Sequence, residues 1–325
     1  MTQKGQPDIF QLAMQIFRHY KNLPVEARGS SIAIGNFDGV HLGHRAVIGE
    51  AGRIAQGQNI PWTVLSFEPH PRSFFNPNKE AFRLTPFKTK AHQIEELGVD
   101  NLIVLRFDKN FAALSADDFV MRVLVDGLDA RHVVSGYDFV FGNKRAGNCG
   151  LLLKKGKDQG FDFTCVSAVN DGETVYSSTK IRDYLKTGDP VAAAKLLGRP
   201  FEIFSKVEHG DKRGQTIGFP TANLFLGEHL KPAHGVYAIK AGVIDGADTK
   251  WLKGVANYGS RPTFNKKDTI LEAHLFNFDG DIYGQQIRIA LIDFLRKEKK
   301  FDGLHDLKAQ IALDCDKARQ ALNDY

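Results

Sequence analysis

The chain has 325 residues, of which 42% are hydrophobic and 25% are charged, a balance typical of a folded globular protein rather than a disordered chain or a fibre. This length exceeds what one core usually spans, so two domains are expected. The formal net charge of +5 fits a protein that handles anionic small molecules, and it also fits weak contact with nucleic acid. The net charge therefore does not distinguish a protein that binds anionic small molecules from one that binds nucleic acid.

The sequence gives no sign of a membrane span or of a disulfide framework. No apolar run is long enough to cross a bilayer, and polar residues interrupt the N-terminus where a signal peptide would need an apolar stretch. The three cysteines, Cys149, Cys165 and Cys315, lie far apart in the sequence and form no Cys-x-x-Cys pair. We therefore expect a reducing cytoplasm as the setting.

From residue 32 to about residue 197, short β-rich runs alternate with amphipathic helical patterns. The predicted strands cover residues 32–35, 62–67, 101–107, 132–135 and 161–166, and predicted helices include 88–97 and 116–126, with Ser115 as an N-cap. This alternation predicts an α/β domain with a parallel, Rossmann-like sheet. Such sheets bind their ligands beyond the carboxyl ends of the strands.

The first predicted strand leads into a Gly-rich turn and a helix start, 35–44, which contains His41 and His44. A strand that turns into a helix directs backbone N–H groups and the positive helix end at one point, where a polyphosphate can bind. One helical turn separates the two histidines, so both rings can face one ligand. Exposed histidines on an ordinary capped turn are the alternative, which the preceding Gly-x-Phe-Asp-Gly disfavours. A zinc site of the His-Glu-x-x-His type is also disfavoured, because the spacing is one residue short and no Glu lies between.

Residues 177–182, Ser-Ser-Thr-Lys-Ile-Arg, place hydroxyl groups at a predicted helix start with Arg182 one turn along. Hydroxyls, free N–H groups and a guanidinium together can hold phosphate. An ordinary N-cap with solvated charges is the alternative for an isolated hexapeptide. Phosphate binding by residues 177–182 is favoured because the chain contains a second predicted phosphate-binding segment at 35–44.

After residue 198 the pattern changes to successive strands with Gly-rich turns. Strands are predicted at 235–241, 250–258, 271–276 and 286–295, and they predict a small antiparallel β-barrel. Apolar residues then recur in helical steps and predict a C-terminal helix packed on the barrel: Leu304, Leu307, Ile311, Cys315, Ala318 and Leu322. The predicted domains are therefore 1–198 and 199–325.

Two features of the second domain could carry chemistry. Residues 209–224 combine glycines with small polar groups, and Thr221 and Asn223 alternate so that both oxygens can reach one cation. The residues by themselves leave a nucleotide–magnesium loop and a long hairpin loop equally open. Strand alternation places Glu272 and His274 on one face, where the Glu272 carboxylate is either a base for a hydroxyl or an exposed strand acid.

The first domain resembles the nucleotidyltransferase module of the prokaryotic bifunctional riboflavin kinase/FAD synthetases. The match runs through four ordered blocks, 35–44, 66–75, 136–142 and 177–182. The second domain resembles riboflavin kinases through the Gly-Phe-Pro-Thr-Ala-Asn signature at 218–223 and through 235–238, 259–264 and 271–275. The resemblance extends from about residue 15 to the end of the chain.

This resemblance implies that the chain phosphorylates riboflavin with ATP to FMN and then adenylates FMN with ATP to FAD and pyrophosphate. Mg²⁺ is the implied cofactor of both steps, and the expected partners are riboflavin, FMN, FAD and ATP, without nucleic acid or membrane. His41 and His44 would stabilise the triphosphate, Glu272 would take the proton of the attacking hydroxyl, and Thr221 and Asn223 would hold Mg²⁺. The further residues assigned to ATP or phosphate are Gly35, Asn36, Phe37, Asp38, Gly39, Ser178, Thr179, Arg182, Gly210, Lys212, Gly214 and Gly218.

Flavin contacts are expected from Phe74, Asp138 and Phe141, which follow predicted strands at the same sheet edge. Core packing is the expectation for Phe67 and Phe139, whereas Phe74, Phe75 and Phe141 are open between core and flavin. Two positions depart from the family pattern: Val140 stands where a basic or polar residue is common, and Lys180 stands where Arg is common. These departures concern contacts with the substrates rather than the reaction class.

Two other classes of protein agree less well with the sequence. A flavin-binding regulator that has lost turnover is disfavoured, because the residues assigned to both reactions are intact. A nucleic-acid-binding protein is disfavoured because the basic residues are dispersed, with 297–300 as the densest run.

Overall fold

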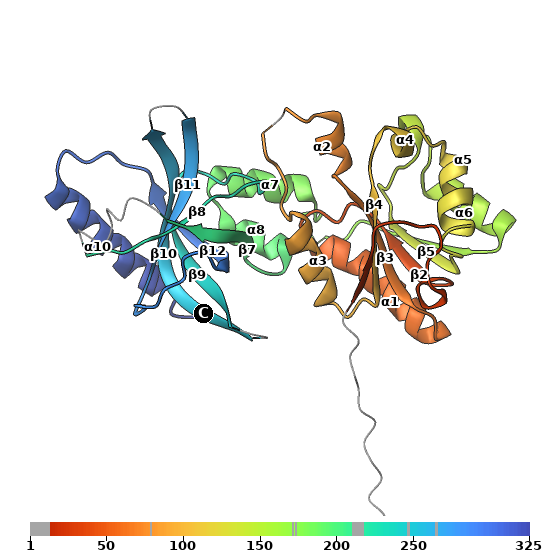
Figure 1. The fold of residues 1–325 in the computed structure, drawn as a ribbon, viewed down its shortest axis with the longest axis horizontal. Coiled ribbons are helices and arrows are strands. Elements are labelled where there is room, and N and C mark those ends of the chain that lie inside the picture. The colour runs from red at the N-terminus through yellow and green to blue at the C-terminus, as the bar shows by residue number, and fades with distance from the viewer. Residues whose placement is uncertain are drawn as a thin grey trace, which may run out of the picture. The chain divides into compact units, whose positions relative to one another are not determined.

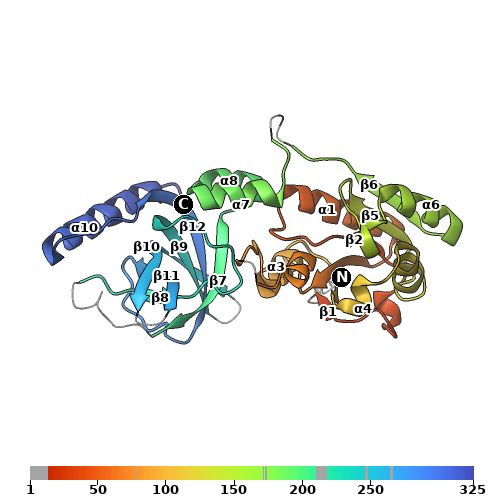
Figure 2. The ribbon, with the colours of Figure 1, turned by 90° about the horizontal axis from the view of Figure 1, so that it is seen from above.

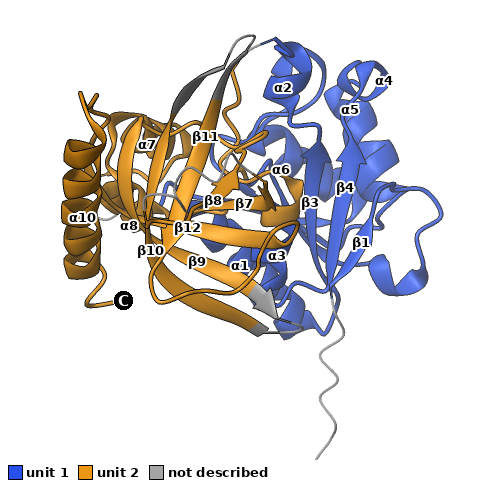
Figure 3. Ribbon diagram, turned by 60° about the vertical axis from the view of Figure 1, so that its left-hand side comes forward, with its two compact units in different colours: residues 1–37, 43–79, 90–170 blue, residues 38–42, 80–89, 171–325 orange. Residues whose placement is uncertain are grey.

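The computed structural model describes residues 14–78, 80–170, 172, 174–209, 218–245, 248–263 and 266–325. The chain forms two compact units (Figure 3). Unit 1 comprises 1–37, 43–79 and 90–170, and unit 2 comprises 38–42, 80–89 and 171–325. The short segment 38–42 therefore packs with unit 2, although the chain on both sides of it belongs to unit 1.

Unit 1 is built on a parallel sheet of six strands in the order β1-β4-β3-β2-β5-β6 (Figure 1). This confirms the predicted Rossmann-like sheet and adds the short edge strand β1, which the sequence pattern did not indicate. The strands are β1(Gln15–Phe17), β2(Ser31–Ile34), β3(Trp62–Glu68), β4(Asn101–Arg106), β5(His132–Gly136) and β6(Asp162–Val166). The helices are η1(Val25–Ala27), α1(Leu42–Gln58), α2(Pro71–Phe75), α3(Phe87–Glu95), α4(Lys109–Ala112), α5(Ala116–Asp118), η2(Phe119–Val125), η3(Asn143–Arg145) and α6(Cys149–Gln159).

Helices cover both faces of this sheet. Ile32 and Ile34 of β2 point to the face where Val120 of the π-helical segment η2 and Leu152 of α6 pack. Ala33 between them is also fully buried, because the opposite face is covered as well. There α1 packs so closely on β3 that a Cβ added to Gly52 would lie 2.7 Å from the Trp62 ring.

Unit 2 is a closed barrel of six strands in the order β10-β11-β8-β7-β12-β9, seen from above in Figure 2. This confirms the predicted antiparallel barrel. The strands are β7(Phe201–Glu208), β8(Ala222–Leu224), β9(Gly235–Asp245), β10(Asp248–Thr263), β11(Lys266–Leu275) and β12(Gln286–Lys297), of which β7 and β8 were not predicted.

Helices α7(Ser178–Thr187) and α8(Pro190–Leu197) share the buried core of the barrel. Ile181, Leu185 and Leu197 pack in one cluster with barrel residues such as Phe201 and Ile289. The two helices are joined through Gly188, which has φ +82°, and Asp189 then caps the next helix by accepting a hydrogen bond from the Ala192 N–H at 2.8 Å.

The predicted C-terminal helix is α10(Leu304–Ala321), which lies along the outside of the barrel (Figure 1). Cys315, Ala318 and Leu322 are buried against the barrel, whereas Leu304 at the start of the helix is 56% exposed. None of the helices in the described part of the chain combines the length and the apolar character that crossing a bilayer requires.

Candidate active sites

The turn between β2 and α1 has an unusual backbone. Phe37, Gly39 and Val40 have φ values of +49°, +96° and +40°. A β-branched residue such as Val is strongly disfavoured in this region, so its neighbours must hold the conformation. Arg199 does so by donating to the Gly39 and Val40 carbonyl oxygens at 2.8 and 3.2 Å. Sequence reasoning missed Arg199, which lies at the predicted domain boundary 159 residues from Val40.

Asp38 is an anchor for this turn rather than an exposed ligand. Its side chain is 3% exposed and accepts hydrogen bonds from the N–H groups of Leu84 and Thr85 at 3.2 and 2.9 Å. The Arg182 guanidinium donates to the same carboxylate at 2.5 Å. The carboxylate therefore ties the 38–42 segment to residues 84–85 and to α7.

Helix α7 starts as predicted, with Ser177 as N-cap accepting from the Lys180 N–H at 3.2 Å. Ser178 donates to the Asp38 carbonyl oxygen at 2.8 Å, and Arg182 Nε donates to the Phe82 carbonyl oxygen at 2.9 Å. The structure thus joins Ser178 and Arg182 to Asp38, whereas Thr179 is exposed on the first turn.

The two histidines differ in environment. His41 precedes α1 and is 5% exposed, and burial lowers its pKa to about 4, with further lowering by Arg182 and Arg199 against an opposing effect of Asp38. It is neutral at physiological pH. His44 lies half-buried in the first turn of α1, with its ring edge-on to Phe37 at a centroid distance of 5.4 Å. The helix therefore begins where the sequence predicted.

In unit 1, the carbonyl oxygen of Asn36 accepts a hydrogen bond from the buried Lys90, a residue that the sequence analysis did not single out. Lys90 is completely buried and donates to the Asn36 carbonyl oxygen at 3.3 Å and to Ser66 Oγ at 3.0 Å, and it pairs with Glu68 at 2.9 Å. The amphipathic pattern of 88–97 gave no signal for this role. Gly35 is required for space, since a Cβ there would lie 2.9 Å from the Phe37 ring.

An aromatic cavity of about 760 Å³ lies in unit 1. Seven of its eighteen lining residues are phenylalanine: Phe67, Phe75, Phe107, Phe111, Phe119, Phe139 and Phe141. The other lining residues include the cationic side chains of Arg72, Lys144 and Arg145, together with Asn36, His70, Val140 and Asn143. Lys144 and Arg145 both have positive φ, +55° and +59°, which is rare for consecutive residues other than glycine. Strained backbone of this kind persists only where the surroundings impose it.

The predicted aromatic residues are distributed around this cavity. Phe67 is buried in the core as expected, and Phe139 packs against that core and also lines the cavity. Phe141 is 7% exposed and stacks on Phe139 at 5.7 Å, so it belongs to both core and cavity. Phe74 packs against Phe75 and Phe107 behind the wall. Asp138 is exposed and does not line the cavity.

In unit 2, the antiparallel register places Glu272 of β11 opposite Asn223 of β8. The alternation expected for β11 is confirmed, with Leu271, Ala273 and Leu275 buried and Glu272 half-buried. Asn223 is 4% exposed, and its Oδ1 atom has no hydrogen-bond partner among the described residues. A buried amide oxygen in this state suits a cation, because burial without a partner is otherwise costly.

A cavity of about 370 Å³ is lined by Thr221, Asn223, Ala273 and Tyr283, among others. Gly218, at the start of the predicted signature, has φ +88° and is exposed. Gly210, Lys212 and Gly214 lie outside the described residues. Glu272 does not line this cavity, but β11 pairs it with Asn223 of β8, and Thr221 lies directly before β8.

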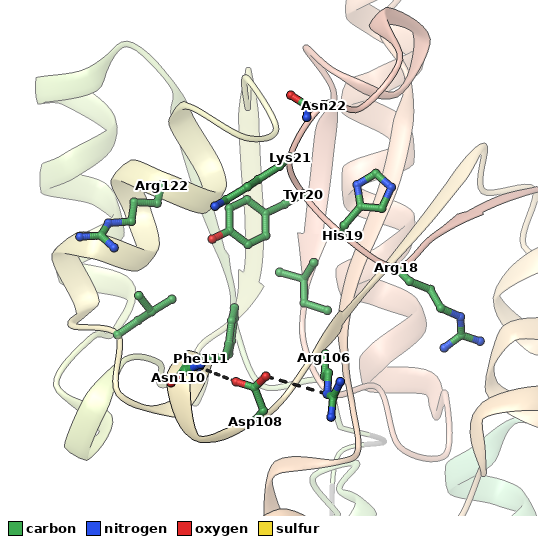
Figure 4. Close-up of a pocket in the computed structure, with 12 residues that line it drawn as sticks. Arg18, His19, Tyr20, Lys21, Asn22, Arg106, Asp108, Asn110, Phe111 and Arg122 are labelled. Atoms are coloured by element: carbon green, nitrogen blue, oxygen red, sulfur yellow. Dashed lines mark hydrogen bonds and ion pairs between the residues drawn. The ribbon is translucent and has the colours of Figure 1, made fainter.

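A third hollow of about 790 Å³ follows the ends of β1 and β4. Figure 4 shows Tyr20 near its centre and the guanidinium groups of Arg18 and Arg122 pointing away from that centre. No residue assigned from the sequence to substrate or metal lines it. Its cations do not converge on one point, in contrast to the groups around Asp38.

Comparison with known proteins matches both halves of the chain. The FAD synthetase family matches residues 23–180, and the riboflavin kinase family matches residues 197–322. The chain is 40% identical to the bifunctional riboflavin kinase/FMN adenylyltransferase of Haemophilus influenzae, over 95% of this chain and 100% of that protein. It is 41% identical to the protein of the same name from Escherichia coli strain K12, over 93% of this chain and 96% of that protein.

A solved structure from Streptococcus pneumoniae, titled as a macrolide-efflux protein, superposes with a TM-score of 0.81 at 28% identity. The superposition covers 93% of this chain and 97% of that one. The Streptococcus pneumoniae chain therefore contains the folds of both units.

Proposed function

Because this chain belongs to the family of bifunctional riboflavin kinases/FMN adenylyltransferases, we propose that separate sets of its residues carry the two reactions. The chain phosphorylates riboflavin with ATP to FMN and adenylates FMN with ATP to FAD. We place the functional boundary between 1–198 and 199–325. The matched ranges 23–180 and 197–322 support this division, although helices α7 and α8 pack with the barrel.

Riboflavin phosphorylation is assigned to Glu272, Thr221 and Asn223. The observation that carries this assignment is the register pairing of Glu272 with Asn223, whose buried Oδ1 has no partner among the described residues. Glu272 takes the proton of the ribityl hydroxyl as that oxygen attacks the terminal phosphate of ATP. Thr221 and Asn223 supply oxygens for Mg²⁺, which when bound neutralises charge on the phosphate oxygens.

FMN adenylation is assigned to the 35–44 turn and to α7. Neutral His41 has one N–H to donate, and His44 offers a second donor from the first turn of α1. Gly35, Asn36, Phe37 and Gly39 shape the turn so that its backbone N–H groups can approach phosphate. Arg182, Ser178 and Asp38 hold the turn in this shape through the contacts described above. Catalysis then rests on positioning and charge stabilisation.

The aromatic cavity of unit 1 is assigned to FMN. Its phenylalanine wall suits a flat, largely apolar ring system, and Arg72, Lys144 and Arg145 suit the FMN phosphate. Phe141 lines the cavity directly, Phe74 supports the wall, and Asp138 lies in the same 136–142 segment. Val140 lines this cavity, so the departure from the family pattern concerns a flavin contact.

We assign the enzyme to the cytoplasm, since Cys149, Cys165 and Cys315 are all free thiols, as a reducing compartment would keep them.

One experiment tests the assignment of both activities. The chain is incubated with riboflavin, ATP and Mg²⁺, and the flavins are separated by chromatography over time. FMN should appear first and FAD should follow, whereas FMN supplied directly should give FAD without riboflavin. Accumulation of neither product by folded protein would contradict the assignment.

A further inference from the structure

Two thiols that are distant in the sequence meet at the edge of the unit 1 sheet. Cys149 is the first residue of α6 and Cys165 lies in β6, yet their Sγ atoms are 2.7 Å apart. Both are free thiols. A disulfide has an S–S length of about 2.05 Å, so the sulfurs need little further approach to form the bond.

We propose that Cys149 and Cys165 form a redox-active dithiol, a modification site that a peroxide closes to an intramolecular disulfide and a dithiol reductant reopens. Neither cysteine is among the residues assigned to either reaction, although Cys149 contacts Gly136, the first residue of the 136–142 segment. The inference does not depend on those assignments.

The surrounding backbone holds the pair in place. Cys149 Sγ lies 3.4 Å from the Gly136 carbonyl oxygen and 3.6 Å from Ser135 Oγ. Ser135 is in turn the register partner of Cys165 across β5 and β6. A helix start and two paired strands therefore fix both sulfurs, and this preorganisation favours the intramolecular bond over pairing with another chain.

Accessibility also favours this pair over the third cysteine. Cys165 is exposed and Cys149 half-buried, whereas Cys315 is 3% exposed on the face of α10 that packs against the barrel. Burial of the sulfur, the hydrogen bond to Cys149 and the nearby Asp138 raise the pKa of the Cys165 thiol to about 12. Cys165 therefore keeps its proton at neutral pH, and we expect slow closure under sustained peroxide rather than a peroxidase turnover.

The chemistry balances with hydrogen peroxide as the oxidant. One sulfur attacks a peroxide oxygen, the O–O bond breaks, and a sulfenic acid and one water form. The second sulfur then attacks the sulfenic sulfur, the S–O bond breaks, and the S–S bond forms with release of a second water. Two thiols thus lose two protons and two electrons, and peroxide takes up both. Because the second sulfur is already in contact, it captures the sulfenic acid before further oxidation.

The test uses the full chain treated with hydrogen peroxide and then labelled with a maleimide under denaturing conditions. The reduced chain carries three cysteines and should take three labels. The oxidised chain should take one label, on Cys315, lose two hydrogens in intact mass and yield a peptide that links Cys149 to Cys165. Dithiothreitol should restore all three labels.

Three serine variants sharpen the result. Cys149→Ser and Cys165→Ser should form no internal disulfide and should gain oxygen atoms on the remaining partner, as sulfinic acid. Cys315→Ser should close its disulfide like the wild-type chain. Three labels after oxidation of the wild-type chain, disulfide-linked dimers, or oxygen adducts in place of the linked peptide would each overturn the proposal.

Discussion

Asn223 and Glu272 are register partners across the antiparallel strands β8 and β11, so their side chains leave the barrel wall on the same face. The Glu272 carboxylate and the Asn223 amide oxygen can therefore take different roles in the same reaction. The Glu272 carboxylate can accept a proton, whereas the Asn223 amide can bind a cation but not take up a proton at neutral pH. The two tasks can be separated by experiment.

Glu272→Gln should abolish most FMN formation from riboflavin, because the amide keeps the shape of the side chain but cannot act as a base. Loss of a general base lowers the rate about a hundred- to ten-thousand-fold. FAD formation from supplied FMN should persist, and initial rates measured by chromatography report both steps. Glu228→Gln, at a side chain that is 76% exposed in the same unit, is the matched control and should behave like wild type. Rescue of Glu272→Gln by extra magnesium would instead identify Glu272 as a metal ligand.

Asn223→Ala should raise the magnesium concentration needed for half-maximal FMN formation, because the variant lacks one oxygen ligand. A magnesium titration of FMN formation measures this shift, with Asn323→Ala at an exposed C-terminal position as the control. An unchanged magnesium dependence with a uniformly lower rate would show that Asn223 acts on the substrate rather than on the metal.

His44→Ala should lower FAD formation about a hundred- to a thousand-fold, as loss of one donor to developing negative charge typically does. FMN should accumulate, because riboflavin phosphorylation uses other residues. His92→Ala, in the same unit at a side chain that is 38% exposed, should leave both rates near normal. Equal loss of both products in a folded His44→Ala protein would contradict the assignment of separate sites.

Arg182→Lys should weaken adenylation about tenfold or more, because lysine lacks the planar fork in which the Arg182 Nε donates to the Phe82 carbonyl oxygen while Nη2 donates to Asp38. The structure refines the reason expected from the sequence, since the guanidinium holds the turn through Asp38. The same variant should also lower the melting temperature, because the Asp38 carboxylate is buried and loses part of its pairing. Wild-type adenylation by Arg182→Lys would show that this contact is dispensable. Arg319→Lys, on the exposed face of α10, is the control.

The stability of the chain should fall in mild acid because of buried histidines. His229 is 3% exposed, and its Nδ1 lies 2.8 Å from the Leu226 carbonyl oxygen while Nε2 accepts from the Phe204 N–H at 3.3 Å, which describes a neutral ring. Burial lowers its pKa to about 4, although Asp38 and the hydrogen bond to Leu226 oppose the shift. As the pH falls from about 6.5 toward 4, the unfolded chain binds a proton that the folded chain excludes, which costs on the order of 3 kcal/mol of unfolding free energy.

Urea unfolding followed from pH 7 to pH 4 measures this loss. His41 contributes in the same direction, since its pKa is also lowered to about 4. His229→Asn should flatten the dependence of stability on pH, whereas His305→Asn, at a side chain that is 97% exposed, should leave the slope unchanged. An unaltered slope in His229→Asn would show that folding does not lower the pKa of this ring.

Much of the fold can be predicted from local sequence patterns, such as the alternation of side chains along strands and the residues that cap helices. Alternation along residues 271–275 assigns Leu271 and Ala273 to the interior and Glu272 to the other face, because side chains of a strand alternate. Ser115 and Ser177 mark helix starts, because their hydroxyls accept from backbone N–H groups three residues on. The short strands β1 and β8, of three residues each, were not predicted, because so few residues carry no measurable alternation.

The sequence by itself determined the position of each motif, because glycine turns, caps and short signatures are local, and the resemblance of these motifs to a known family implied both reaction classes. Only the tertiary structure decided the contacts between distant residues. Arg182 reaches Asp38 across 144 residues, and Arg199 fixes the Val40 carbonyl across 159. Cys149 and Cys165 meet because β5, β6 and α6 pack together. Such contacts arise from chain topology and side-chain packing. The type of a residue and its spacing along the chain do not reveal them.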